Sequence, residues 1–246
     1  MLTHPVLLIR GTGNERDAQA LGNLGIPTVS ESFTQILSGN ADVAWNLLTL
    51  LRDLQGWVII TSRNAIDYWS SLVSPQSLAK ALTSNTGLKF AAIGAGSADA
   101  LRSHGVSEIL IPEMPSSAGL VAILSEYPVS SAILPVGDLA RGTLPAELRN
   151  LGWTVKTGVT YINSLVTIPP AVLAAVERGE FSGVLLRSPS AVRAFAHFVP
   201  NSKIPVICGG TTASQEAQEL ALNVVAIASD PSPEAIAKLI AQTLEE

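Results

Sequence analysis

Six short segments of the chain carry small, hydroxyl-bearing or basic residues, and each lies between an apolar run and a helical pattern. A helix that begins directly after a strand has free backbone N–H groups at its start, and its dipole also favours an anion there. Six such turns facing one cleft would suit a ligand with many negative charges. They span residues 10–14, 61–64, 94–97, 137–141, 187–190 and 209–212.

The same residue types have a purely structural alternative, because Ser, Thr and Asn are common N-caps of helices. Capping alone could explain any single turn. Arginine is present in or beside four of the six turns, however, at positions 10, 63, 141 and 187. This combination favours binding of an anionic ligand.

Other catalytic signatures are missing from the sequence. It contains no phosphate loop, no nucleophile elbow and no zinc-binding helix motif. Gly94 and Gly96 follow an apolar run as in a dinucleotide fingerprint, with Glu113 placed to reach a ribose, but Asp99 occupies the third small position. A nicotinamide-dependent oxidoreductase is therefore a weak alternative. The three histidines are too scattered to form a metal site, so we expect neither a metal nor a cofactor.

The elements that must position these turns are short apolar runs alternating with helical patterns, which is typical of a parallel sheet covered by helices. Ligands of such sheets bind outside the carboxyl ends of the strands, where the six turns are. The expected strands are residues 6–9, 26–32, 57–61, 90–93, 108–111, 132–135, 154–161, 183–187, 205–208 and 223–228.

The alternation is also an internal repeat. The sequence VIITSRNA at 58–65 returns as VLLRSPSA at 184–191, and IGAGSA at 93–98 returns as CGGTTA at 208–213. Two similar α/β domains explain both matches. The chain leaves the two copies at matching places, so it could cross between the domains twice, although contiguous domains are the simpler arrangement.

Composition sets further limits. The 246 residues are 47% hydrophobic and 14% charged, which excludes a disordered chain. No apolar run approaches the ~18 residues of a membrane span, and the first residues lack the features of a signal peptide. The net charge of −5 argues against a general nucleic-acid binder. With one cysteine, Cys208, there is no internal disulfide, and we expect a cytoplasmic protein with no membrane or nucleic-acid partner.

Several motifs, in this order and spacing, resemble those of the uroporphyrinogen-III synthase family. These enzymes of heme biosynthesis close hydroxymethylbilane into a ring while inverting its last pyrrole. The motifs are ITSRNA at 60–65, FAAIG at 90–94, PVGDLARG at 135–142, VTY at 159–161, LRSPS at 186–190, GGTTA at 209–213 and SPEAI at 232–236.

The resemblance implies a cyclising lyase with two similar doubly wound parallel-sheet domains, a two-stranded β hinge and a cleft between the domains. The first domain would comprise residues 1–33 and 168–246, the second 38–160, and the hinge strands 33–40 and 161–168. The substrate, hydroxymethylbilane, would bind without a cofactor. The resemblance also suggests a monomer in transient contact with hydroxymethylbilane synthase, which supplies this unstable compound.

Site residues also follow from the resemblance. Tyr161 matches a tyrosine proposed to assist loss of the terminal hydroxyl, although a purely structural hydrogen bond is its alternative role. Gly11 stands where many relatives carry proline, and Ser97 replaces a commoner threonine. The residues that match substrate-binding positions are Arg10, Ser62, Arg63, Ser97, Arg141, Ser188, Thr211 and Thr212.

One further function stays open beside the synthase. A non-catalytic two-domain protein could close around a small anionic ligand, and the same six turns would serve it. Production of the inverted ring isomer would distinguish the enzyme from this binding protein.

Overall fold

The computed structural model describes residues 2–11, 13–140 and 142–244 of the chain. The chain forms two compact units. We call Met1–Ile36 with Ser164–Glu246 the terminal unit, and Leu37–Asn163 the central unit. The chain therefore passes between the units twice, once within strand β3 (Thr34–Ser38) and once at the end of strand β7 (Thr154–Leu165).

The terminal unit contains a five-stranded sheet in the order β10-β9-β8-β1-β2. All neighbouring strands are parallel. The strands are β1 (Val6–Leu8), β2 (Thr28–Ser30), β8 (Gly183–Leu186), β9 (Val206–Cys208) and β10 (Val224–Ile227).

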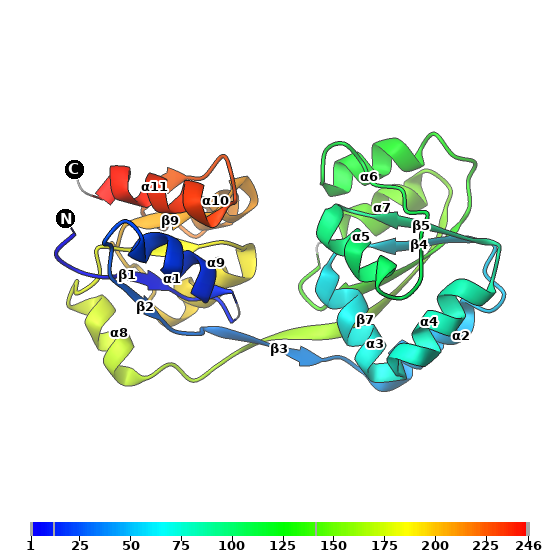
Figure 1. Ribbon diagram of the computed structural model, residues 1–246, viewed down its shortest axis with the longest axis horizontal. Helices are drawn as coiled ribbons and strands as arrows, with labels where there is room; N and C mark the ends of the chain where they lie inside the picture. Colours follow the sequence, from blue (N-terminus) through cyan, green and yellow to red (C-terminus); the bar gives the residue numbers. More distant parts are fainter. Residues whose placement is uncertain (1, 12, 141, 245–246) are drawn as a thin grey trace. The chain divides into compact units, whose positions relative to one another are not determined.

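Helices cover both faces of this sheet (Figure 1). Successive strand residues pack on opposite sides: Leu7 and Val184 belong to one core cluster, and Val6 and Leu185 to the other. The first cluster includes residues of α8 (Pro170–Glu177), α9 (Pro189–Phe198) and α10 (Thr211–Glu219). The second includes residues of α1 (Asn14–Gly22) and α11 (Pro233–Leu244). Burial on both faces explains why β1, β8 and β9 have no polar residue, whereas the edge strand β2 contains Thr28 and Ser30.

The central unit has a second five-stranded sheet, in the order β3-β7-β6-β4-β5. Its strands β4, β5, β6 and β7 are parallel to their neighbours. The strands not yet given are β4 (Gly56–Ile60), β5 (Leu88–Ala92) and β6 (Ser131–Gly137). Beside β3, the Gly39 N–H donates to the Thr160 carbonyl of β7 at 2.9 Å.

Two layers of helices also cover the central sheet (Figure 1). Val58 and Ile60 pack with one layer, and Trp57 and Ile59 with the other. The first layer is α2 (Ala41–Leu50), α3 (Arg63–Val73), α4 (Pro75–Ser84) and α5 (Ala95–Arg102). The second is α6 (Ser117–Leu124) and α7 (Thr143–Asn150).

The expected α/β class with two parallel sheets is confirmed, but the strand expected at residues 108–111 is wrong. Only Leu110 pairs there, through hydrogen bonds with Phe90 and Ala92 of edge strand β5. The next donor in this parallel pattern would be residue 112, which is Pro112 and has no N–H. The pairing therefore ends after one bridge.

In each sheet there is one pair of neighbouring strands from which the chain continues in opposite directions across the sheet. In the terminal unit this switch point lies between β1 and β8, and in the central unit between β4 and β6. Loops at the carboxyl ends of such strand pairs diverge and leave room for a ligand. Within the described ranges, no helix combines the length and apolar character needed to span a lipid bilayer.

Candidate functional site

A pocket of about 440 Å³ lies at the switch point of the central unit. Thr61 and Ser62, which follow β4, line it together with Gly137 and Asp138 at the end of β6. Tyr161 enters the lining from β7. The sequence therefore brings two of its expected site residues, Ser62 and Tyr161, into one pocket.

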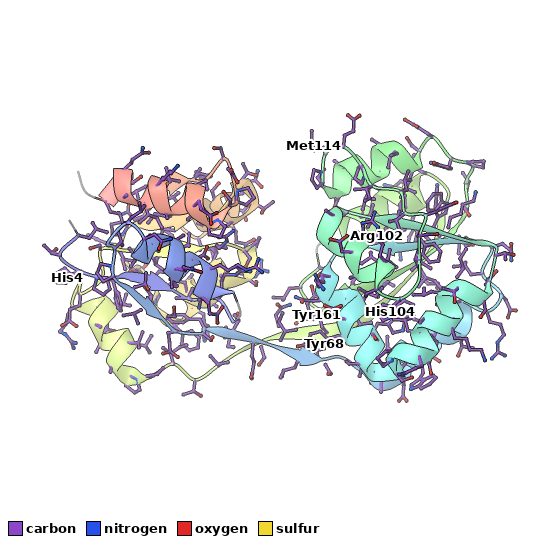
Figure 2. All side chains as sticks on the ribbon, in the orientation of Figure 1. His4, Tyr68, Arg102, His104, Met114 and Tyr161 are labelled. Carbon is purple, nitrogen blue, oxygen red and sulfur yellow. The ribbon has the colours of Figure 1, made fainter. Side chains whose placement is uncertain are left out.

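The phenol of Tyr161 is held by three neighbours. Its Oη donates a long hydrogen bond of 3.4 Å to Ser62 Oγ. Its ring centroid lies 6.1 Å from that of Tyr68 on α3, and Figure 2 shows the two rings near each other. On another side the ring touches the backbone of Gly137, where an added Cβ would lie only 2.4 Å from Tyr161 Cζ.

A β-bulge accounts for the position of Tyr161. Along β6 and β7, Val136 pairs with Val159, but Gly137 pairs with Tyr161, so Thr160 is the extra residue. Thr160 is buried, and its hydroxyl donates to the Ala65 carbonyl at 2.8 Å. The bulge thus places the tyrosine ring beside the one residue of β6 that has no side chain to exclude it.

Ser62 and Ser188 occupy matching positions in the two copies of the repeated turn. Both are N-caps with extended backbone, Ser62 before α3 and Ser188 before α9. Ser188 Oγ accepts from the Ala191 N–H at 3.2 Å and thereby caps its helix. The Ser62 side chain makes no capping hydrogen bond. Its hydroxyl is therefore available to a ligand in the pocket.

The capping explanation holds for few of the six turns. The helices α1, α3, α5 and α10 all follow one of these turns, and none has a hydrogen bond from the side chain of its N-cap residue. Among these helices and α9, only α9 is capped in this way. Four helix starts at the carboxyl ends of strands thus lack a capping hydrogen bond from the N-cap side chain, and α1 has acidic residues in its first turn.

Arg63 and Ser97, two other expected residues of the central unit, are not part of the lining of this pocket. Arg63 is exposed on α3, and its Nε lies 3.3 Å from Asp67 Oδ2. Ser97 is buried on α5 beyond the end of β5. Arg141, expected from the sequence to bind substrate, lies outside the described residues.

In the terminal unit, the expected residues follow three adjacent strands. Arg10 follows β1, Ser188 follows β8, and Thr211 and Thr212 follow β9. Both threonines are exposed at the start of α10. The strand order thus places all four residues at the carboxyl edge of one sheet.

The structure adds a charged cluster that the sequence reasoning missed. Arg187 donates from Nη1 to Asp17 Oδ1 at 2.5 Å and from Nη2 to the Pro231 carbonyl. The Asp17 side chain is only 2% exposed, and burial raises the pKa of its carboxyl group in spite of the nearby Arg187 and Arg10. Burial, followed by the charge of Arg187, lowers the pKa of Arg10. Asp17 lies on the apolar stripe of α1 with Ala20 and Leu21. A charged residue in such a stripe was the sequence signal that could have identified it.

A larger hollow of about 770 Å³ lies along β5, lined by Trp57, Lys89 and Tyr127 among others. It contains none of the expected site residues, and Trp57 and Lys89 lie toward the amino ends of their strands. Its position argues against a role in the chemistry. Across the described ranges, no group of three or more His, Cys, Asp or Glu side chains could hold a metal ion.

Comparisons with known proteins agree on one family. The family model described as "Uroporphyrinogen-III synthase HemD" matches residues 16–238. No curated protein matches the chain.

Two solved structures share the fold along nearly the whole chain. A mutant uroporphyrinogen III synthase from the extremely thermophilic bacterium Thermus thermophilus is 14% identical with a TM-score of 0.70, and the match covers 98% of this chain and 99% of that one. Uroporphyrinogen-III synthetase from Helicobacter pylori is 17% identical with a TM-score of 0.63 and the same coverage. At these identities the structures establish similarity of fold.

Proposed function

The chain belongs to the uroporphyrinogen-III synthase family, and from this we propose that Tyr161 and Ser62 act on hydroxymethylbilane in the pocket between the ends of β4 and β6. The family reaction is that of a cyclising lyase of tetrapyrrole biosynthesis. It closes the linear substrate with loss of water and inversion of ring D. The observation that carries the proposal is the Tyr161 phenol, held between Gly137 and Ser62 in this pocket.

Positioning dominates the proposed mechanism. Hydroxymethylbilane can lose its terminal hydroxyl unaided, which gives a reactive azafulvene. The enzyme must therefore mainly determine which ring carbon attacks the azafulvene. Holding the substituted carbon of ring D against the azafulvene carbon leads to a spiro intermediate, which fragments and recloses with ring D inverted. Orientation of this kind can supply most of a rate enhancement without an indispensable catalytic group.

Tyr161 assists by donating a hydrogen bond to the departing hydroxyl. In the protein without substrate, the phenol donates to Ser62 Oγ over a long 3.4 Å. Exchanging so long a hydrogen bond for one to the substrate costs little free energy. The Gly137 backbone keeps the ring in place during this exchange, because the close packing fixes its position.

Carboxylate contacts in both units complete the proposed binding. In the central unit they come from Ser62, Arg63, Ser97 and Arg141, and in the terminal unit from Arg10, Ser188, Thr211 and Thr212. The uncapped starts of α3, α5 and α10 support these assignments, because their free N–H groups are suited to carboxylates.

The two crossings of the chain support a domain assignment. We assign residues 1–33 with 168–246 and residues 38–160 as the domains of the enzyme, and 33–40 with 161–168 as its hinge. β3 and β7 are neighbours in one sheet, and the Val166 N–H donates to the Phe33 carbonyl at 3.3 Å. We also propose a monomeric cytoplasmic enzyme that meets hydroxymethylbilane synthase transiently; sedimentation of the two proteins, alone and mixed, tests the monomeric state and the contact.

The decisive experiment adds the protein to freshly made hydroxymethylbilane and separates the ring isomers by chromatography. The proposed function predicts the type-III isomer. A non-catalytic binding protein for an anionic ligand would leave only the type-I isomer of the uncatalysed reaction, and no feature of the described residues favours that alternative.

A further inference from the structure

Two arginines lie next to each other at the switch point of the terminal unit. In the parallel pairing of β1 and β8, Leu7 lies opposite Val184 and Leu8 opposite Leu185. The same register, continued by two residues, brings Arg10 opposite Arg187. Like charges so close repel each other, so an acid or a bound anion must compensate them.

Among the described residues, direct hydrogen bonds and ion pairs engage only one of the two guanidinium groups. Arg187 is engaged by Asp17 and by the Pro231 carbonyl. The Arg10 guanidinium has no hydrogen bond or ion pair with any residue in the described ranges, although Asp17 and Glu15 are near enough to act on it. Asp17 Oδ2 is also buried without a partner among those residues. A cation and a buried carboxylate oxygen thus remain unpaired close to each other.

Arg187 explains why Arg10 and Asp17 stay apart. It neutralises the buried Asp17 through Oδ1, and its own charge repels Arg10. Without Arg187, Asp17 would be a buried anion with no counter-ion, which is strongly unfavourable. The Arg10 guanidinium is close by, and it would then turn to Asp17.

Arg10 also lines a pocket. This hollow of about 360 Å³ is lined by Arg10, Asn14, Ser30 and Ser32, and by Glu15 at the start of α1. The cation, the Ser30 hydroxyl and an uncapped helix start suit a carboxylate, whereas the negative charge of Glu15 opposes one. The Ser32 hydroxyl donates to the Arg10 carbonyl at 3.1 Å and so holds the backbone of this pocket. No Arg187 atom belongs to the described lining.

We propose that Arg10 is the cation of a carboxylate-binding subsite within the terminal unit, and that Arg187 keeps Arg10 available by engaging Asp17. Arg187 and Asp17 are then positioning residues that do not touch the ligand. The carboxylate is one of those on the tetrapyrrole, so the inference rests on the proposed function. It assigns a positioning role to Asp17, which belongs to none of the sequence motifs, and to Arg187, which is part of the turn at 187–190.

Binding of uroporphyrin III, a stable octacarboxylate, measured by calorimetry tests this arrangement without relying on catalysis. We expect R10Q to weaken binding about tenfold, as for a lost charge-assisted hydrogen bond. R187Q should weaken binding by a similar factor, because Arg10 turns to Asp17. D17N leaves no charged carboxylate at position 17 to attract Arg10. The affinities of D17N and D17N/R187Q for uroporphyrin III should therefore agree within about twofold.

Three measurements separate this result from simpler explanations. R178Q removes an exposed cation of the same unit, paired with Glu180, and gives the size of the long-range charge effect. R187K keeps the charge beside Asp17 and should bind within about threefold of wild type. Urea unfolding checks each variant, and the comparison of D17N with D17N/R187Q stands even if R187Q alone does not fold.

The outcomes are separable from those of the proposed function. If R187Q weakens uroporphyrin III binding by the same factor in the wild-type and D17N backgrounds, Arg187 acts by its charge or by direct contact with the ligand. That result would overturn the inference. Failure of the wild-type protein to bind uroporphyrin III overturns it as well. The type-III isomer assay reports separately on the enzyme activity, so a protein that forms this isomer without Arg187–Asp17 coupling contradicts the inference alone.

Discussion

Ser62 and Ser188 have the same place in two copies of one strand–turn–helix unit, yet their hydroxyl groups have different partners. Ser188 accepts from the backbone of its own helix, and Ser62 accepts from the phenol of Tyr161. A repeated sequence thus supplies a serine that caps its helix in one unit and a serine without a capping bond in the other. Stability and catalysis should respond differently when each hydroxyl is removed.

Ser188→Ala should lower the free energy of unfolding by about 1 kcal/mol, the usual effect of losing an N-cap. Ser62→Ala removes no capping bond and should change this free energy by less than about 0.5 kcal/mol. It should instead lower kcat for type-III formation about three- to tenfold, as for one neutral hydrogen bond. Urea unfolding and the isomer assay measure the two effects; an equal loss of stability in both variants would contradict the assignment.

Tyr161→Phe should retain measurable formation of the type-III isomer. The phenol only assists departure of the hydroxyl, and positioned donors typically contribute about 100- to 10,000-fold. Folding should change little, because the variant loses one long hydrogen bond. Rapid mixing with hydroxymethylbilane and separation of isomers measures the result. A product that contains only the type-I isomer would show that Tyr161 is indispensable.

Gly137→Ala should reduce kcat at least as much as Tyr161→Phe. The added methyl group would lie 2.7 Å from Tyr161 Oη and must displace the ring. Such overpacking costs about 1–3 kcal/mol in stability. In the Tyr161→Phe background the same change should cost less activity, because the hydroxyl is already absent.

Gly22→Ala is the matched control for this change. An added Cβ at Gly22 contacts nothing within 4 Å. Gly22 is the last residue of α1 and is distant in sequence from the residues that line the pocket. The isomer assay should show wild-type activity for this variant. Additive effects of Gly137→Ala and Tyr161→Phe in the double variant would argue against contact between the two residues as the cause.

Cys208 should make the protein less stable in alkali. Burial raises the pKa of its thiol to about 11, from a value of 9.0 without burial. The unfolded chain therefore loses this proton first, and the free energy of unfolding falls as pH rises from about 9 to about 11. The loss is about 3 kcal/mol in total, at about 1.4 kcal/mol per pH unit.

Urea unfolding at about pH 8 and about pH 11, compared with Cys208→Ala, isolates this contribution. The variant lacks the thiol, so the difference between the two proteins should shrink or reverse as pH rises. A difference that is constant with pH would mean that the thiol ionises equally in the folded and unfolded chains.

The strands were predictable because both faces of each sheet are covered. Runs such as 57–60 and 184–186 are apolar throughout, and burial at every position places them in a core. Residues 108–111 have a similar composition, but Pro112 removes the next donor and the strand does not form. The apolar composition of this segment does not show whether its hydrogen bonds to β5 can continue, and that continuity decides whether a strand forms.

The site was predictable only in part. The small and hydroxyl-bearing turns lie at the ends of strands, as their positions in the repeat indicated. The contact of Tyr161 with Gly137 depends on a bulge, and the neighbourhood of Arg10 and Arg187 depends on the register of two strands distant in sequence. Neither is encoded in a local pattern, so both required the structure.

Strands β1 and β8 are neighbours in the terminal unit, yet the whole central unit separates them in the chain. β1 is made before the central unit, while its neighbour β8 begins at Gly183 and is made only after that unit. The central unit can therefore fold before β8 exists, and until then β2 is the only strand available to pair with the apolar β1 among the described strands of its sheet. A chain released early would retain one sheet and expose β1, which makes premature termination a direct route to aggregation or proteolysis of this protein.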